Sequence, residues 1–299
     1  MLGYTKKLYI LPFDHRASFV RSFIGENVEK LNKQQKKTVE SYKKIIYDGF
    51  LFAYKKLKNK ELAAILVDQA FGASIIKSAQ KKKINTLVST EKSGQKLFAF
   101  EYGNDFAKEI LQTKPDIVKV LVRYNPANIK DNITQLKRLK RLDDWCKAHD
   151  YKFLAEILVP ATKADLAKVK GNQEKYDKQI RPRLAVKMVK EFHQAGIEPD
   201  IWKIEAFTNK SDWEKVISII RQGKERKDVG IIMLGRGVSF AKVKQWIDIC
   251  PQDKVNGFAV GRTVFLRALK DYYARRINKK EAIEQIAKNY LELVRYWEK

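Results

Sequence analysis

The sequence is short of cysteine and histidine and has no long apolar run, and each shortage excludes a class of protein. Its two cysteines, Cys146 and Cys250, lie far apart and form no CxxC pair, which excludes a disulfide scaffold and indicates a reducing compartment. No apolar stretch approaches the roughly 20 residues of a membrane span, and the N-terminus lacks the features of a signal peptide. We therefore expect a cytoplasmic protein without a membrane partner.

Motifs for metals and cofactors are also missing. The three histidines, His15, His149 and His193, are scattered along the chain, whereas a catalytic zinc site needs about three clustered ligands. There is no GxGxxG after an apolar run, no GxxxxGK[ST] and no GxSxG. We expect no metal ion and no organic cofactor.

Acidic residues are few relative to basic ones. The chain has 35 Asp and Glu against 61 Lys and Arg, so its formal net charge is +26. This excess permits binding to nucleic acid and favours anionic substrates, but it does not indicate a fold. With 44% apolar residues over 299 positions, a disordered chain is excluded.

Short apolar runs alternate with longer amphipathic segments along the whole chain. The runs have the length and near-continuous hydrophobicity of parallel strands buried on both faces. They are Leu8–Phe13, Ala63–Val67, Asn85–Ser89, Ile117–Val122, Phe153–Val159, Ile201–Ile204, Gly230–Leu234 and Gly257–Val260. About eight β-then-α units without a linker predict an α/β fold, a (β/α)8 TIM barrel forming a single domain over residues 1–299, with its core at about 7–275. An open doubly wound sheet is the alternative, although its glycine-rich dinucleotide turn is missing.

Two helical segments are predicted from their apolar spacing. The stretch Lys33–Lys60 is expected to bury Val39, Ile46, Phe50 and Tyr54 and to turn its lysines to solvent. The stretch Lys279–Trp297 predicts an extra C-terminal helix after the barrel.

Nearly every predicted strand is followed by polar residues at its carboxyl end, which is where barrel enzymes place their reactive groups. Each of these residues alone could be a solvated loop residue, but together on one rim they indicate a binding site. Those expected to contact a substrate are Asp14, Arg16, Asp68, Glu91, Arg123 and Glu205.

Two lysines lie inside apolar runs rather than after them. Strand alternation places Lys203 on one face with Ile201 and Glu205, and Lys119 on one face with Arg123. A lysine buried in a barrel is expected to have a lowered pKa, and its neutral amine could then attack a ketone to form a Schiff base. The alternative for either lysine is a structural ion pair with an interior carboxylate.

One acid is embedded in an apolar run in the same way. Glu156 lies within Phe153–Val159, and burial should raise its pKa, the direction that suits general acid–base catalysis. An ion pair with an interior lysine is again the alternative.

Glycine–arginine pairs follow the last two strands. They are Gly235-Arg236 and Gly261-Arg262, at the two loops where barrels frequently bind phosphate. Glycine lets backbone N–H groups approach an anion and arginine offers a forked donor, so we expect a phosphate-binding site there. A turn glycine followed by a surface arginine is the alternative.

A set of motifs in this order resembles a known family over residues from about Lys7 to Leu269. The motifs are Leu11-Pro12-Phe13-Asp14-His15-Arg16, Val67-Asp68-Gln69-Ala70-Phe71-Gly72, Glu91-Lys92-Ser93-Gly94-Gln95, Phe100-Glu101-Tyr102-Gly103, Val118-Lys119-Val120-Leu121-Val122-Arg123-Tyr124-Asn125-Pro126, Glu156-Ile157-Leu158-Val159-Pro160-Ala161-Thr162, Pro199-Asp200-Ile201-Trp202-Lys203-Ile204-Glu205 and Val260-Gly261-Arg262-Thr263-Val264-Phe265. The set resembles the aldolase-like domain that follows the sugar kinase in bifunctional inositol-catabolism proteins, assigned as 2-deoxy-5-keto-gluconate-6-phosphate aldolase. That domain is similar in turn to the class I tagatose-bisphosphate aldolases.

The resemblance implies a role for several residues. Lys203 would be the Schiff-base lysine, Lys119 a partner cation and Glu156 the acid and base, while Arg262 would hold a phosphate. It also implies a phosphorylated keto sugar or sugar acid as the substrate and a reaction without a metal. Assembly into a homo-oligomer is left open by the sequence.

Two alternatives remain open from the sequence. One is a non-catalytic barrel that binds RNA or DNA through its basic surface, although no nucleic-acid-binding module is recognisable and binding of this kind would weaken steeply with salt. The other keeps the imine but changes the reaction, as in a transaldolase or a sulfo-sugar aldolase.

Overall fold

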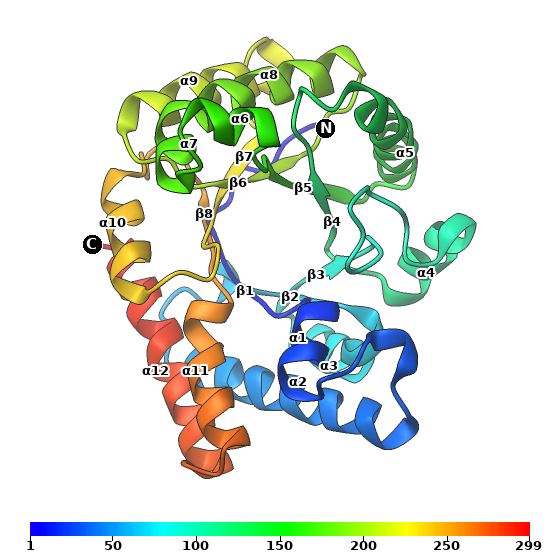
Figure 1. The fold of residues 1–299 in the computed structure, drawn as a ribbon. Helices are drawn as coiled ribbons and strands as arrows, with labels where there is room; N and C mark the ends of the chain where they lie inside the picture. The colour runs from blue at the N-terminus through cyan, green and yellow to red at the C-terminus, as the bar shows by residue number, and fades with distance from the viewer.

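Eight parallel strands close into a barrel in the computed structural model, which describes residues 1–299 (Figure 1). The strands are β1 (Leu8–Pro12), β2 (Ala63–Val67), β3 (Asn85–Ser89), β4 (Ile117–Arg123), β5 (Lys152–Leu158), β6 (Ile201–Glu205), β7 (Gly230–Leu234) and β8 (Gly257–Ala259). Each strand pairs with the next along the chain, and β8 pairs with β1 to close the ring. The predicted (β/α)8 barrel is confirmed, and each predicted strand end lies within one residue of the observed end.

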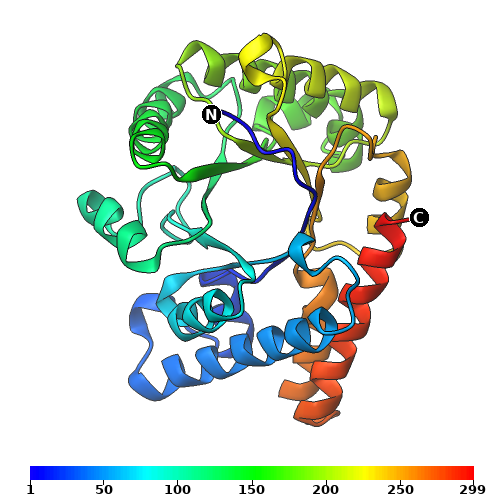
Figure 2. The ribbon, with the colours of Figure 1, turned by 180° about the vertical axis from the view of Figure 1, so that it is seen from behind.

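Helices surround the barrel on its outer side, as views from opposite directions show (Figure 1 and Figure 2). They are α1 (Ala17–Phe23), α2 (Lys33–Tyr54), α3 (Gln69–Lys81), α4 (Phe106–Thr113), α5 (Ile129–Ala148), α6 (Lys163–Lys168), α7 (Gln173–Gln179), α8 (Arg181–Gln194), α9 (Lys210–Ile220), α10 (Phe240–Ile249), α11 (Arg262–Tyr273) and α12 (Lys279–Trp297). None of them combines the length and the apolar character that a membrane span requires.

The predicted helix Lys33–Lys60 is shorter at its C-terminal end. It begins at Lys33 with a capping box between Asn32 and Gln35, and it ends at Tyr54. The last buried side chain of α2 is Ala53, and the following residues up to Lys60 are mostly exposed. A longer helix would therefore have no apolar face to pack against the barrel.

The extra C-terminal helix, α12, covers the barrel where its first and last strands meet. The hydroxyl of Tyr290 donates a hydrogen bond of 2.7 Å to the carbonyl oxygen of Tyr9 on β1. The ring of Trp297 packs 5.7 Å from that of Phe258 on β8. Because α12 also packs against α2 and α11, it buries apolar surface between these helices and the barrel.

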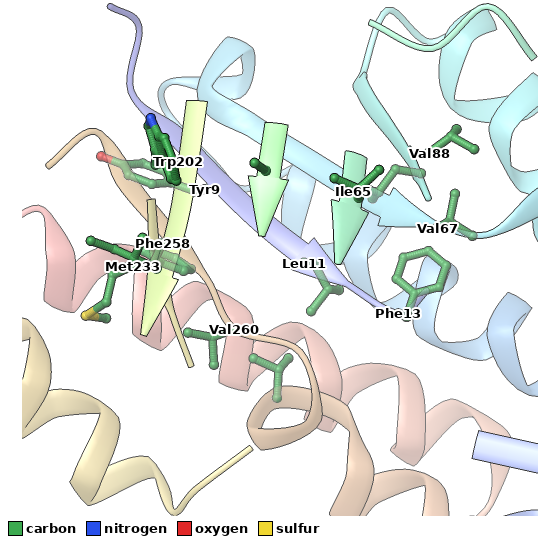
Figure 3. Close-up of a cluster of buried hydrophobic side chains, with 14 of the residues drawn as sticks. Tyr9, Leu11, Phe13, Ile65, Val67, Val88, Trp202, Met233, Phe258 and Val260 are labelled. Carbon is green, nitrogen blue, oxygen red and sulfur yellow. The ribbon is translucent and has the colours of Figure 1, made fainter. Parts of the chain in front are cut away.

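Alternate residues of each strand form two separate apolar layers. The outward side chains, including Tyr9, Leu11, Trp202 and Phe258, pack under the helices (Figure 3). The inward layer is a small cluster formed by Leu8, Ile10, Ala64, Leu66, Leu87, Ile117, Leu154, Ile201, Ile232 and Ala259. On β6 the inward face continues from Ile201 to Lys203 and Glu205, so apolar residues fill the amino end of the barrel and charged residues occupy its carboxyl end.

Candidate active site

A cavity of about 740 Å³ opens at the carboxyl ends of the strands. Its walls are the inward faces of β4, β5 and β6 and the loops that follow β1, β3, β5, β7 and β8. Ten of the predicted site residues line it: Lys203, Glu156, Asp14, Arg16, Glu91, Arg123, Glu205, Arg236, Gly261 and Arg262. Lys119 is fully buried beneath the cavity, and Asp68 and Gly235 lie outside its lining.

Lys119 is surrounded by three carboxylates from three different strand ends. Its Nζ lies 2.7 Å from Oδ2 of Asp14, 2.8 Å from Oε1 of Glu91 and 3.0 Å from Oε2 of Glu156. Burial alone would lower the pKa of Lys119, but the three negative charges outweigh it and hold this pKa above its ordinary value. The prediction of a lowered pKa at Lys119 is therefore wrong, and this lysine is a fixed cation.

Lys203 shares one of these carboxylates with Lys119. Its Nζ lies 2.9 Å from Oε2 of Glu156, the same oxygen that contacts Lys119. The contact follows from strand register, because Glu156 on β5 is the direct neighbour of Lys203 on β6 and both side chains point into the barrel. The Lys203 side chain is 3% exposed and lines the cavity, so a ligand can reach its amine.

The direction of the Glu156 pKa corrects a second expectation. Burial would raise this pKa, but Lys119 and Lys203 flank the carboxylate and together hold the pKa below its ordinary value. Glu156 is therefore ionised at neutral pH and is suited to accept a proton rather than to donate one.

The two other carboxylates around Lys119 differ in their protonation. Burial raises the pKa of Asp14, but the positive charge of Lys119, together with that of Lys203, outweighs burial and lowers this pKa. Glu91 has its pKa raised by burial and by the charge of Asp14, and its Oε2 is buried without a hydrogen-bond donor. Glu91 is therefore the acid of this cluster that holds a proton most readily.

His15 is a cavity residue that is absent from the set predicted to contact substrate. It follows Asp14 directly after β1, and its buried Nδ1 has no hydrogen-bond partner. Burial, reinforced by the positive charge of Arg262, lowers its pKa to about 4 despite the nearby Asp14. The sequence signal that could have identified His15 as a cavity residue was its position between Asp14 and Arg16 at the end of a predicted strand. The structure places a neutral imidazole in the cavity.

His15 is expected to make the protein less stable as the pH falls from 6.5 to 4. In the unfolded chain the imidazole takes up a proton below its ordinary pKa of 6.5, whereas in the folded protein it does so near 4. The free energy of unfolding should then fall by about 2 kcal/mol between pH 7 and pH 5 because of this group. In His15→Gln this part of the pH dependence disappears, as urea unfolding at the two pH values would measure.

The exposed His149 provides the matched control for this experiment. His149→Gln should keep the pH dependence of the unmodified protein. If His15→Gln lost as much stability between pH 7 and pH 5 as the unmodified protein does, the prediction would be contradicted, because His15 would then take up its proton equally well in the folded and unfolded states.

Arg16 lines the cavity but is already paired. Its guanidinium lies 2.6 Å from Oε2 of Glu101 and also donates to the carbonyl oxygen of Glu91. Glu101 was not singled out from the sequence as a functional residue, although it lies in one of the family motifs. The pair joins the loops after β1 and β3, so Arg16 mainly orders the cavity wall.

Asp68 corrects the expected set of substrate ligands. Its carboxylate is fully buried, caps α3 by accepting the N–H of Phe71 at 2.9 Å and forms an ion pair with Lys43. Lys43 also donates to the carbonyl oxygen of Phe13 at 2.9 Å. The predicted solvent position of the α2 lysines is thus wrong for Lys43, which has the i, i+4 spacing from Val39 that marks the buried stripe.

The predicted phosphate site is only partly free to bind an anion. Arg236 is held 2.6 Å from Oδ2 of Asp177 and 3.2 Å from Oε1 of Glu205, and the other oxygen of Glu205 accepts the N–H of Val159. Arg262 has no carboxylate partner and donates to the carbonyl oxygen of Arg236 at 3.0 Å.

The glycines at these two strand ends are required for close packing. A Cβ on Gly261 would lie 2.1 Å from the carbonyl oxygen of Pro12, whereas Gly237 has a φ of +72°, a backbone conformation that other residues rarely adopt. Gly235 packs against Val260 and does not line the cavity, so its predicted contact with phosphate is replaced by a packing role. An anion at this end would meet Arg262 and the backbone at the start of α11.

Comparisons with known proteins agree with the barrel fold. Residues 3–299 match the model of a family described as "Uncharacterized protein conserved in bacteria (DUF2090)". No curated protein matches the chain.

Many solved structures resemble the chain, among them two with TM-scores above 0.5. Cgl0159 from Corynebacterium glutamicum has 15% identity and a TM-score of 0.54, with 97% of this chain and 87% of that chain covered. The YdjI aldolase from Escherichia coli K12 has 13% identity and a TM-score of 0.52, with 85% of this chain and 87% of that chain covered. At these identities the similarity shows a shared fold.

Proposed function

The chain belongs to the DUF2090 family, and we propose that it is a class I aldolase, which cleaves a carbon–carbon bond through an imine on Lys203. The observation that carries the proposal is the amine of Lys203 at the cavity surface, 2.9 Å from the ionised carboxylate of Glu156. A nucleophilic amine next to a base inside a barrel cavity is the arrangement that imine chemistry requires. The fold shared with an aldolase supports the proposal at the level of architecture.

The environments of the two lysines favour Lys203 over Lys119 as the nucleophile. Lys119 is fully buried, is bound by three carboxylates and has a raised pKa, so neither its position nor its protonation suits attack on a ketone. Lys203 contacts one carboxylate and lines the cavity. Lys119 instead keeps Glu156 ionised.

The reaction then follows from the positions of these groups. Lys203 loses a proton to Glu156, and its amine attacks the substrate ketone. Glu156 returns this proton to the hydroxyl of the adduct, which leaves as water and gives an iminium ion, so that Glu156 is again ionised. Glu156 accepts the proton of the hydroxyl on the carbon that becomes the aldehyde, and the electrons of the cleaved bond pass to the iminium to form an enamine. A proton returns to the enamine carbon, and hydrolysis releases the ketone and restores Lys203.

The substrate class comes from the sequence resemblance and fits the charges of the cavity. We propose a phosphorylated keto sugar or keto sugar acid, such as 2-deoxy-5-keto-gluconate 6-phosphate, cleaved to dihydroxyacetone phosphate and an aldehyde. Arg262 lacks a carboxylate partner and lies at the start of α11, where backbone N–H groups also favour an anion. Its position supports phosphate binding at this end of the cavity.

Reductive trapping tests the proposal. Treating the protein with dihydroxyacetone phosphate and borohydride should reduce the imine to a stable amine, and peptide mass spectrometry should find the added mass on Lys203. The peptide that contains Lys119 serves as the internal control and should stay unmodified. Modification of Lys119 would reverse the two roles, and a folded protein with no adduct would contradict the proposal.

A further inference from the structure

Five arginines line the cavity, but they differ in whether a carboxylate neutralises them. Arg16 and Arg236 form ion pairs with cavity-wall acids. Arg21, Arg123 and Arg262 line the cavity without a carboxylate within ion-pair distance. An unpaired guanidinium beside a cavity is available to an anionic group of a ligand.

Two of the unpaired arginines lie on opposite sides of Lys203. The strand order around the barrel is β4, β5, β6, β7, β8. Arg123 is the last residue of β4, Lys203 lies on β6, and Arg262 begins α11, the helix that follows β8. Each arginine is therefore two strands from the strand of Lys203, or about 10 Å along the barrel wall. In a closed ring of eight strands, β4 and β8 are diametrically opposite.

Arg123 also lies closer to the mouth of the cavity than the reacting groups. Its inward neighbour on β4, Leu121, is in register with Glu156, so Arg123 lies one inward position further toward the carboxyl end. This step is about 7 Å along the strand. The exposed side chain makes a single long hydrogen bond, 3.3 Å to the carbonyl oxygen of Gln95, and Lys92 lines the same side of the cavity.

The floor of the cavity offers no free cation to an anionic ligand. Asp14, Glu91 and Glu156 line the floor and are grouped around Lys119, so the positive charge of Lys119 is already neutralised and cannot attract a second negative group. Arg262 on the β8 side can meet one anion, and Arg123 at the end of β4 offers a second unpaired guanidinium on the opposite side of the barrel. Rim cations at both ends therefore fit a ligand that is anionic at both ends.

We propose that Arg123 is a specificity-determining residue, which selects an aldehyde fragment with an anionic group at the end away from the reacting carbonyl. The inference rests on the proposed aldolase function. The planar fork of a guanidinium binds a carboxylate or a phosphate through paired hydrogen bonds, so either group has the required chemistry.

Condensation of dihydroxyacetone phosphate with three aldehydes tests the proposal. The aldehydes are 3-oxopropanoate, which has a carboxylate, glyceraldehyde 3-phosphate, which has a phosphate, and propanal, which is uncharged. The unmodified protein should prefer a charged acceptor, and which of the two it prefers identifies the anion. In Arg123→Gln we expect kcat/KM for that acceptor to fall about 10- to 100-fold, with the value for propanal changing by less than about 2-fold.

Arg183, which is exposed on α8 outside the cavity, provides the matched control. Arg183→Gln makes the same change in net charge and should leave all three rates unchanged. Equal losses for all three acceptors in Arg123→Gln, or no loss for the charged ones, would overturn the role of Arg123. The role of Arg123 would also be overturned if neither charged acceptor reacted while borohydride still trapped dihydroxyacetone phosphate on Lys203. Failure of that trapping would instead overturn the aldolase function itself.

Discussion

Replacing Lys203 with arginine is expected to abolish carbon–carbon bond cleavage while the barrel stays folded. Arginine keeps a positive charge beside Glu156, so the ion pair that closes the floor of the cavity is retained. Its guanidinium stays protonated at any pH at which the protein is folded and cannot form an imine. We expect kcat to fall by at least about 10⁴-fold, within the range found when a catalytic nucleophile is removed.

The measurement is turnover of the keto sugar phosphate together with borohydride trapping and a thermal unfolding curve. Lys152→Arg is the matched control, because Lys152 also lies on a barrel strand and pairs with a carboxylate, 2.8 Å from Oδ1 of Asp200, but at the start of β5, away from the cavity. That variant should retain full activity. Substantial turnover by Lys203→Arg would contradict the imine mechanism, whatever the result of trapping.

The position of Lys203 could be predicted because it depends on local sequence alone. Alternation within Ile201–Glu205 fixes which residues share a face, and the structure shows Ile201 of this face in the inner apolar cluster. The same local argument predicted that Lys119 and Arg123 on β4 share a face, and Arg123 lines the cavity. Strand boundaries were predictable for the same reason, since buried parallel strands leave continuous apolar runs.

The pKa directions could not be predicted because they depend on side chains that are distant in the sequence. Burial alone predicts a lowered pKa for Lys119 and a raised one for Glu156, and both directions are reversed in the structure. For Lys119 the reversal comes from Asp14, Glu156 and Glu91, and for Glu156 it comes from Lys119 and Lys203. Closure of the barrel brings Asp14 and Glu91, at the ends of β1 and β3, within 2.7 and 2.8 Å of Lys119. A short-range pattern gives no information about such contacts.

Asp68 shows a second limit of the sequence. Its place after β2 is equivalent to that of Asp14 after β1, yet it turns away from the cavity to pair with Lys43 on α2. The distinction depends on a lysine within the apolar stripe of a helix 25 residues earlier. Position at a strand end therefore predicts the rim of the barrel but not which rim residues face the cavity.

Replacing Glu156 with glutamine is expected to lower kcat by about 10²- to 10⁴-fold, the usual contribution of a general base. Glutamine keeps the shape of the side chain and can contact Lys203, but it cannot accept a proton from the amine or from the substrate hydroxyl. Lys119 retains Asp14 and Glu91 as partners, so the variant should fold. Slow formation of the imine does not prevent its accumulation, so borohydride should still modify Lys203.

Glu91→Gln is the matched comparison, because Glu91 and Glu156 both contact Lys119 but only Glu156 contacts Lys203. If Glu156 is the base, the loss in Glu91→Gln should be at least about tenfold smaller.

The pH dependence of kcat/KM distinguishes the two acids independently. The pKa of Glu156 is lowered, so activity that depends on its ionised form should fall only below pH 4.5, whereas the raised pKa of Glu91 would place the fall above pH 4.5. A larger loss in Glu91→Gln, together with a fall in activity above pH 4.5, would transfer the role of base from Glu156 to Glu91 and leave Lys203 as the nucleophile.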